Sequence, residues 1–294
     1  MIGLVANVAG SEVHGGHDAQ SLRLAFVLLR YFPFGGLQRD FLRIAKACQA
    51  RGHRVEVHTL RWEGARPEGF VITEYPVIGI TNHARVWSFA DRVAAVLATS
   101  PVDCVIGFNR IPGLDIYYAA DPCFALRLRR PSAVWLRWLP RFRAYLGLEA
   151  AVFGPEGALR ILTLTAAQER DYSDCYGTPA SRFRRIPPPL SPDRARPLDA
   201  DSQRAEFRRE FALDNETCVL LALGSGFATK GLDRSLRALA AIRDLNPNMD
   251  LRLYVVGSGD TAPYRRLARQ LGVLNRVIFF GGREDVPRFL LGAA

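Results

Sequence analysis

Two stretches of the sequence combine glycines with charged side chains in a pattern typical of phosphate-binding sites. In Leu24–Asp40 an apolar run leads to Gly35-Gly36, and a helical segment then opens with the carboxylate of Asp40. In Cys218–Lys230 a second apolar run leads to Gly224 and Gly226. A strand, a glycine turn and a helix bring backbone N–H groups close to an anionic ligand. An ordinary tight turn explains either glycine pair about as well.

Lysine is scarce, which draws attention to one of its positions. The net charge is +10, yet lysine occurs only at Lys46 and Lys230, and every other basic residue is arginine. Lys230 precedes a predicted helix with Asp233 in its first turn, where a cation is unfavourable unless an anion is near. We therefore predict that Lys230 lies beside a diphosphate and that Gly224 gives the backbone room. A solvated lysine is the alternative interpretation.

Two more glycine-containing loops follow apolar runs in the same half of the chain. Gly257 follows the run Leu251–Val256, and Arg283, Asp285 and Val286 follow the run ending at Phe280. Ligands bind at the carboxyl edge of a parallel sheet, so the three loops together predict a crevice. The Gly35-Gly36 turn is not a G-x-G-x-x-G sequence, which disfavours a nicotinamide dehydrogenase. Residues 224–231 are not a Walker A sequence, which disfavours a P-loop enzyme.

Carboxylates also follow strand-like runs in the first half of the chain. Asp121 follows Ile116–Ala119 and can orient sugar hydroxyls or take a proton; a turn-initiating Asp before Pro122 is the alternative. Asp40 follows the Gly-Gly pair within about one helical turn, where the helix dipole alone would also favour an acid. His83 is more typical of a loop histidine than of a catalytic one.

One basic segment interleaves arginines with aromatic residues. Phe124–Tyr145 contains no acid, and its arginines and tryptophans suit the headgroup region of an anionic membrane or a single-stranded nucleic acid. A surface helix whose aromatic residues pack inward is the alternative. Pro131 and Pro140 predict a kinked or two-part element. The candidate membrane contacts are Arg127, Arg129, Arg130, Trp135, Arg137, Trp138, Arg141 and Arg143.

The elements that must position these residues alternate between strands and helices. Unbroken apolar runs favour buried parallel strands, and amphipathic stretches such as Leu37–Ala50 and Leu232–Arg243 favour helices between them. This alternation predicts a doubly wound α/β fold. The predicted strands are Leu24–Leu29, Val55–Leu60, Cys104–Phe108, Ile116–Ala119, Arg160–Thr165, Cys218–Leu223, Leu251–Val256 and Val277–Phe280.

Proline marks the predicted domain boundary. The proline-dense segment Ile186–Pro197 reads as a connector, which gives a loose N-terminal extension over residues 1–22, a first domain over 23–189 and a second over 190–294. The second is short for a doubly wound unit, and no closing element is predicted after Phe289.

Composition excludes several classes of protein. No apolar run is long enough to span a bilayer, and the N-terminus does not resemble a secretory signal. The five cysteines are odd in number and lack a Cys-x-x-Cys pair, which predicts free thiols in a reducing compartment. The basic net charge predicts an acidic partner: nucleic acid, an anionic membrane or a phosphorylated substrate.

Several motifs resemble one known family. Tyr31–Asp40, Thr81–His83, Gly107–Asn109, Pro112–Asp115 and Lys230–Ser235 are similar to the lipopolysaccharide core glucosyltransferases, retaining GT-B enzymes of glycosyltransferase family 4. The resemblance runs from Leu24 to the C-terminus. It implies two Rossmann-like domains that face a cleft, UDP-glucose as donor, an inner-core heptose as acceptor, and no metal or other cofactor. It also implies work at the cytoplasmic face of the inner membrane.

The resemblance assigns roles to individual residues. Asp121 would face the transferred sugar, Asp40 would line the cleft, and Arg194 with Lys230 would neutralise the diphosphate. The donor site would contain Gly36, Arg194, Gly224, Lys230, Gly257, Arg283, Asp285 and Val286. The acceptor side would contain Asn82, His83 and Asn109. Glucose and galactose differ at one stereocentre, so the donor sugar stays open between them.

Two departures from the family pattern shape the alternatives. Thr229 stands where family members carry an arginine, and the family's Glu-x7-Glu segment would follow only beyond Ala294, so the chain is expected to be C-terminally truncated. We rank a UDP-sugar-dependent hexosyltransferase first. A non-catalytic, membrane-associated remnant that binds nucleotide sugars ranks second, and a nucleic-acid binder third.

Overall fold

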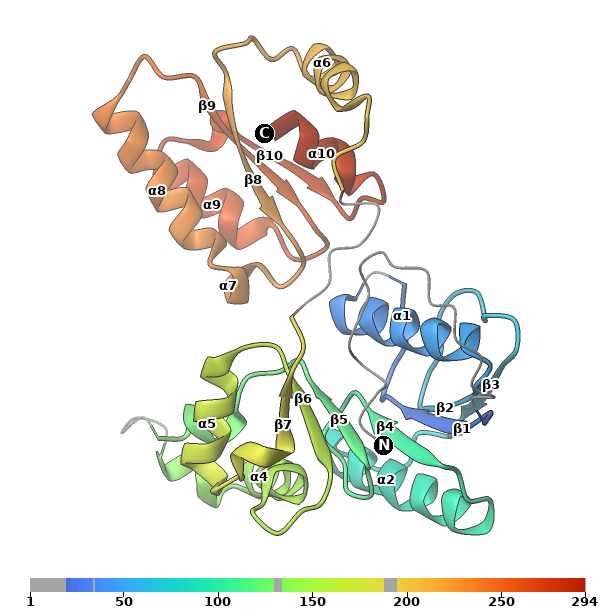
Figure 1. Ribbon diagram of the computed structural model, residues 1–294. Coiled ribbons are helices and arrows are strands. Elements are labelled where there is room, and N and C mark those ends of the chain that lie inside the picture. Colours follow the sequence, from blue (N-terminus) through green and yellow to red (C-terminus); the bar gives the residue numbers. More distant parts are fainter. Residues whose placement is uncertain (1–19, 34, 130–133, 188–194, 294) are drawn as a thin grey trace. The chain divides into compact units, whose positions relative to one another are not determined.

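The computed structural model describes residues 20–33, 35–129, 134–187 and 195–293 in two compact units, residues 1–188 and 189–294 (Figure 1). Each unit contains a parallel sheet with helices on both faces. The doubly wound α/β prediction is therefore confirmed for each unit.

Unit 1, residues 1–188, has a seven-stranded parallel sheet in the order β3-β2-β1-β4-β5-β6-β7. The order reverses beside β1, because β2 pairs on one side of it and β4 on the other. Such a switch point is where open α/β sheets bind ligands. The strands are β1 (Arg23–Val27), β2 (Arg54–Thr59), β3 (Phe70–Glu74), β4 (Cys104–Gly107), β5 (Ile116–Ala119), β6 (Arg160–Thr163) and β7 (Phe183–Arg185).

Helices bury both faces of this sheet. Phe26 of β1 packs with Phe41 of α1 on one face, whereas Val27 packs with Phe89 of α2 and Phe153 of α4 on the other. This two-sided burial explains why the central strands are continuous apolar runs. The helices are α1 (Gly36–Ala50), α2 (Asn82–Thr99), α3 (Phe124–Arg127), α4 (Pro140–Phe153) and α5 (Ala166–Tyr176), with 3-10 turns at Val134–Trp138 and Ala180–Arg182.

Unit 2, residues 189–294, has the parallel sheet order β10-β9-β8. Leu236 and Leu253 belong to the apolar cluster on one face, and Phe207, Tyr254 and Phe289 belong to the cluster on the other. Its elements are α6 (Ala200–Glu210), β8 (Cys218–Leu223), α7 (Phe227–Lys230), α8 (Leu232–Leu245), β9 (Leu251–Val256), α9 (Ala262–Gln270), a 3-10 turn (Leu274–Arg276), β10 (Val277–Gly281) and α10 (Val286–Ala293).

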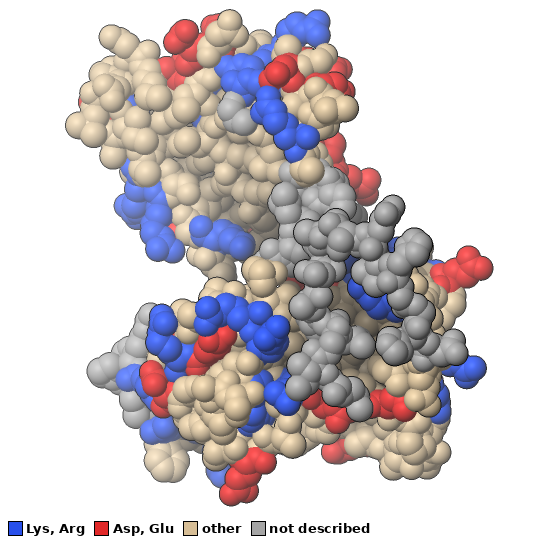
Figure 2. All heavy atoms as spheres, in the orientation of Figure 1, with Lys and Arg blue, Asp and Glu red and all other residues tan. Residues whose placement is uncertain are grey.

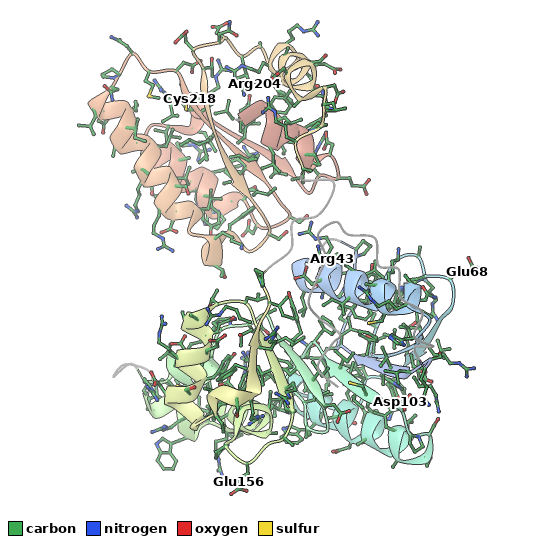
Figure 3. All side chains as sticks on the ribbon, viewed as in Figure 1. Arg43, Glu68, Asp103, Glu156, Arg204 and Cys218 are labelled. Atoms are coloured by element: carbon green, nitrogen blue, oxygen red, sulfur yellow. The ribbon has the colours of Figure 1, made fainter. Side chains whose placement is uncertain are left out.

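Three sequence predictions about elements were wrong. Strands β3 and β7 were not predicted, because edge strands are half exposed and lack a continuous apolar run. A helix, α10, occupies the region for which no closing element was predicted. It packs Phe289 into the core, and Arg204 of α6 donates to the Leu291 carbonyl oxygen at 3.1 Å (Figure 3).

Candidate functional site

The glycine loops of unit 2 meet at the carboxyl edge of its sheet, as the sequence predicts. The N–H of Gly224 donates to the carbonyl oxygen of Val256 at 2.8 Å, and the N–H of Gly257 donates to that of Gly281 at 2.8 Å. Strand β8 ends at Leu223 opposite Val256 of β9. The first residues of the three loops therefore lie side by side.

Gly257 is where a side chain would prevent this approach. A Cβ there would lie 2.3 Å from the carbonyl oxygen of Gly224 and 3.0 Å from the N of Ser225. The first distance is far inside van der Waals contact, and backbone atoms cannot rotate away as a side chain can. The packing of the loops thus requires glycine at this position.

Lys230 lies over the first of these loops. A Cβ on Gly224 would be only 3.6 Å from Cε of Lys230, so the lysine side chain runs across the glycine. Lys230 is exposed, and no carboxylate in the described part of the chain pairs with it. As predicted, Lys230 precedes a helix, α8, that carries Asp233 in its first turn. Lys230 also ends the short helix α7, and Gly231 at φ 72° separates the two helices.

A hollow of about 450 Å³ opens beside Lys230. Cavities of this size hold organic ligands that bury most of their surface. Lys230 and Ser235 supply polar side chains, and the rest of the lining is mainly apolar. The hollow is lined by Leu220, Leu221, Ala222, Leu223, Gly224, Phe227, Lys230, Leu232, Ser235, Ala238 and Leu253.

The third loop of unit 2 is organised by an ion pair. Arg283 donates to both carboxylate oxygens of Asp285, from Nε at 2.8 Å and from Nη2 at 2.7 Å. These bonds lower the pKa of Asp285 despite partial burial, which opposes the shift. Val286 is buried and begins α10. Arg194, the second predicted phosphate ligand, lies outside the described residues.

Gly36 begins helix α1 at the carboxyl end of β1 in unit 1. A Cβ on Gly36 would meet no atom within 4 Å, and its φ does not lie in the left-handed region. Within the described structure, neither packing nor backbone conformation requires glycine there. A ligand bound close to the backbone at the N-terminus of α1 would leave no room for a side chain and would therefore require glycine at this position.

Asp40 is held by two partners. Its carboxylate accepts from the Tyr118 hydroxyl at 2.8 Å and from Nη2 of Arg43 at 2.8 Å (Figure 3). Burial raises the pKa of Tyr118, and the Asp40 carboxylate raises it further, so the hydroxyl donates at neutral pH. The prediction that Asp40 opens the helix was wrong, because α1 begins at Gly36 and its first turn carries no acid.

The predicted acceptor-side residues follow other strands of the same sheet. Asn109 follows β4, and its Oδ1 accepts from the N–H of Leu29 at 2.8 Å, which ties the ends of β4 and β1 together. Asn82 and His83 begin α2, and the His83 ring lies 6.4 Å from that of Tyr145 on α4. The parallel sheet therefore places these residues and Gly36 along one edge.

Asp121 follows β5 on the same edge, and its carboxylate is exposed. No side chain among the described residues hydrogen-bonds to this carboxylate. Its backbone is held instead, because the Tyr172 hydroxyl donates to the Asp121 carbonyl oxygen at 2.8 Å. A fixed backbone with an unengaged carboxylate can present a charge to a ligand.

The basic aromatic segment is divided, as its prolines predict. It forms α3, a 3-10 turn and α4, with Pro140 at the start of α4; Arg130 lies outside the described residues. Phe124 stacks on Phe142 at 5.7 Å, whereas Trp135 and Trp138 are 60% and 77% exposed. The arginines of the segment that the structure describes are exposed as well: Arg127, Arg129, Arg137, Arg141 and Arg143.

The exposed tryptophans and arginines form an amphipathic surface rather than an inward-packed one. In the same unit, basic side chains also gather over α5 (Figure 2). No helix in the described ranges is long and apolar enough to cross a membrane. Within the same ranges, no three His, Cys, Asp or Glu side chains cluster as a metal site would require.

Sequence reasoning missed a buried pair beside Asp121. Glu149 of α4 is 0% exposed, and its Oε1 lies 3.2 Å from Nη1 of Arg110. The signal was present: Glu149 is the only acid in the otherwise apolar run Leu146–Phe153. A carboxylate in such a run needs a buried partner, although the sequence does not say which.

Comparison with protein families matches both units. Residues 34–194 match Glycosyltransferase Family 4, and residues 203–294 match Glycosyl transferases group 1. The first match alone covers more than half of the chain.

Individual relatives extend this comparison. The chain is 39% identical over 270 residues to the lipopolysaccharide glucosyltransferase WaaG of Escherichia coli K12, which is 92% of this chain and 72% of that protein. The crystal structure of WaaG matches with a TM-score of 0.83 over 91% of this chain and 72% of that one. A 15% identical structure, Anabaena HepE with UDP and glucose, shares the fold with a TM-score of 0.62, covering 92% and 72% of the two chains.

Proposed function

The chain belongs to glycosyltransferase family 4 and has the GT-B type of α/β fold, and from this premise we propose which sugar it transfers. The proposed reaction moves glucose from UDP-glucose to an inner-core heptose of lipopolysaccharide, with retention of anomeric configuration. The relative WaaG, 39% identical over 92% of this chain, supports the donor and the pathway through its name. The observation that carries the proposal is Lys230, an exposed cation without a described carboxylate partner, lying across a glycine loop.

The proposed mechanism is electrostatic. UDP leaves with negative charge on its terminal phosphate, and preorganised cations and N–H groups stabilise that charge. Lys230 is placed to do this, and Arg194 is assigned the same role from the sequence. Gly36 leaves space for a phosphate at the N-terminus of α1. In this proposal these groups, rather than a metal ion, offset the negative charge of the diphosphate.

The remaining donor contacts are assigned to the loops of unit 2. Gly224 and Gly257 let the backbone approach the nucleotide closely. The Arg283–Asp285 pair keeps its loop in one conformation, so that backbone groups near Val286 are available to the base. The donor sugar itself, glucose rather than galactose, rests on the relative's name.

Unit 1 is assigned the reacting sugar and the acceptor. The Asp121 carboxylate is exposed and unengaged by described side chains, so it can bind a sugar hydroxyl or stabilise positive charge at the anomeric carbon. Asp40 is already bonded to Tyr118 and Arg43, which suits orientation of a substrate better than proton abstraction. Asn82, His83 and Asn109 are assigned to the acceptor side.

We further propose that the enzyme works on the cytoplasmic face of the inner membrane. Its acceptor is a lipid, and Trp135, Trp138 and the exposed arginines around them have the chemistry of an anionic-headgroup contact. The arginines would bind lipid phosphates while the indole rings lie at headgroup depth.

The test is transfer of radiolabelled glucose from UDP-glucose to purified lipopolysaccharide that ends at the inner-core heptose. We expect a labelled, chain-dependent product that carries an α-linked glucose, with UDP-galactose giving a much lower rate. Labelled product from UDP-galactose alone would overturn the donor assignment. Binding of UDP-glucose without any transfer would overturn the enzymatic proposal.

That last outcome is the second candidate function, binding of a nucleotide sugar without catalysis. Nucleic-acid binding is the third candidate, and it rests on the net charge and on the chemistry of the basic aromatic segment. Salt-dependent oligonucleotide binding that UDP does not displace would revive it.

A further inference from the structure

A buried carboxylate with several hydrogen-bond donors, that of Glu149, lies behind the Asp121 loop. Oε1 of Glu149 accepts from the N–H of Phe124 at 2.8 Å, and Oε2 accepts from the N–H of Ala125 at 2.8 Å and from the Tyr176 hydroxyl at 2.7 Å. The thiol of Cys123 lies 3.8 Å from Oε2. Each of these backbone contacts falls on the few residues that follow Asp121.

Arg110 completes the arrangement from the end of β4. Its Nη1 pairs with Glu149 at 3.2 Å, and its Nη2 donates to the Pro122 carbonyl oxygen at 2.7 Å and to the Tyr172 hydroxyl at 3.0 Å. Burial disfavours the charge on Arg110, but Tyr117, Tyr172 and Glu149 outweigh burial and raise the pKa of the guanidinium. Arg110 therefore stays charged within the protein.

The two charged side chains both bond to the same short loop. Tyr172, which Arg110 orients, donates to the Asp121 carbonyl oxygen at 2.8 Å, and Gln168 donates to the Ala119 carbonyl oxygen at 3.0 Å. The backbone is thus bonded at Ala119, Asp121, Pro122, Phe124 and Ala125, whereas the Asp121 carboxylate stays exposed.

Such a pair has no evident advantage for stability alone. Burying two charges costs free energy that their mutual attraction often only offsets, and apolar residues of similar size frequently serve as well. What an ion pair with several hydrogen bonds provides is a single geometry for the groups around it. The groups around this pair are those of the Asp121 loop.

We propose that Glu149 and Arg110 are positioning residues for sugar transfer: together they fix the backbone from Asp121 to Ala125 and so hold the Asp121 carboxylate at the reacting sugar. Neither residue touches the substrate, and both act through the loop. This inference rests on the proposed transfer reaction and on the role of Asp121 in it.

Two substitutions test the positioning role. Glu149→Gln preserves shape but removes the charge and offers an N–H₂ group to donors. Tyr172→Phe removes only the hydroxyl that holds the Asp121 carbonyl oxygen. Tyr75→Phe is the matched control, because it also removes a buried hydroxyl hydrogen bond, 2.8 Å to Nδ1 of His58, elsewhere in unit 1.

We expect kcat to fall about tenfold in Tyr172→Phe and about a hundredfold in Glu149→Gln, since small misplacements of reacting groups have effects of this size. The KM for UDP-glucose should change less than about twofold, because the nucleotide contacts assigned to unit 2 are untouched. Tyr75→Phe should keep the wild-type kcat. Equal kcat in wild type and Tyr172→Phe, or an equal loss in Tyr75→Phe, would overturn the inference.

A second measurement does not depend on catalysis. Amide hydrogen exchange of peptides covering residues 121–127 should become at least about tenfold faster in Glu149→Gln, while peptides from α1 and from unit 2 keep their protection. Unchanged protection of residues 121–127 would show that Glu149 does not fix the loop. If the wild-type chain transferred no sugar, the proposed function would fail, and the exchange result would still decide whether the pair holds the loop.

Discussion

The carboxyl edges of the two sheets are built in different ways. In unit 2 backbone hydrogen bonds donated by glycines join the loops, from Gly224 to Val256 and from Gly257 to Gly281. Lys230 is exposed there and has no described carboxylate partner. In unit 1 side chains hold the strand ends: Asn109 bonds to the backbone of Leu29, and Tyr118 bonds to Asp40.

This difference indicates a division of work. An edge shaped by glycine backbone allows a large, flat and charged ligand to approach N–H groups directly. An edge held by buried side chains fixes individual functional groups within a narrow range of positions, which is what a reacting centre needs. We therefore associate unit 2 with binding of the nucleotide and the side chains of unit 1 with the chemical step, while Gly36, a backbone position of unit 1, is assigned to the donor phosphates.

The largest test of this comparison removes the cation of unit 2. Lys230→Ala should lower kcat/KM for UDP-glucose by about 10²–10³-fold, because a preorganised charge on the leaving group contributes on that scale. Its unfolding midpoint should stay unchanged, since the side chain is exposed. Lys46→Ala, at the other lysine, is the matched control and should keep full activity. Equal losses of kcat/KM in the two variants would show that Lys230 has no special role in nucleotide binding by unit 2.

The second test adds one methyl group to the backbone edge of unit 2. Gly257→Ala places Cβ 2.3 Å from the Gly224 carbonyl oxygen, and we expect the free energy of unfolding to fall by about 1–3 kcal/mol, as for overpacked sites. Urea unfolding measures this loss. A variant as stable as the wild type would show that the Gly224 and Gly257 loops can move apart at no cost in free energy, so that their close packing does not require glycine.

The third test makes the same change in unit 1. Gly36→Ala meets no atom within 4 Å, so stability should be unchanged or higher by up to about 1 kcal/mol, because alanine favours the helix. UDP-glucose affinity, measured by calorimetry, should nevertheless fall about tenfold, the consequence of excluding a closely approaching ligand. Unchanged affinity would show that the donor does not approach Gly36 closely.

The fourth test loosens one side chain of unit 1. Tyr118→Phe removes the hydroxyl that donates to Asp40 at 2.8 Å and should lower the free energy of unfolding by about 1 kcal/mol. The rate of transfer should fall severalfold at saturating donor, because Asp40 is then held by Arg43 alone among its described partners. A change in donor affinity without a change in rate would contradict the division of work.

The smallest effect concerns a residue outside both edges. Trp138→Ala removes a side chain that is 77% exposed, so unfolding and transfer to a detergent-dispersed acceptor should not change. Binding to vesicles that contain phosphatidylglycerol should weaken severalfold, as loss of an interfacial tryptophan predicts. Undiminished vesicle binding would show that Trp138 does not take part in the proposed membrane contact.

Much of the fold could be predicted because its strands are buried on both faces. Leu24–Leu29 and Leu251–Val256 stand out as apolar runs for that reason, whereas the edge strand β7, with the sequence Phe183-Arg-Arg185, gave no such signal. The glycine loops and Lys230 were predictable as well, because special backbone positions and rare residue types are visible locally. Glu149 was missed because burial of a carboxylate depends on partners that are distant in sequence.

The sequence by itself determined the alternation of strands and helices, the glycine turns that end the strands, and the rare lysine beside one of them. These features depend on residue type and on spacings of a few residues. Only the tertiary structure decided that Tyr118 would bond to Asp40 and that Arg110 would pair with Glu149. Hydrogen bonds form only over about 3 Å, and such distances between remote residues are set by sheet register and helix packing.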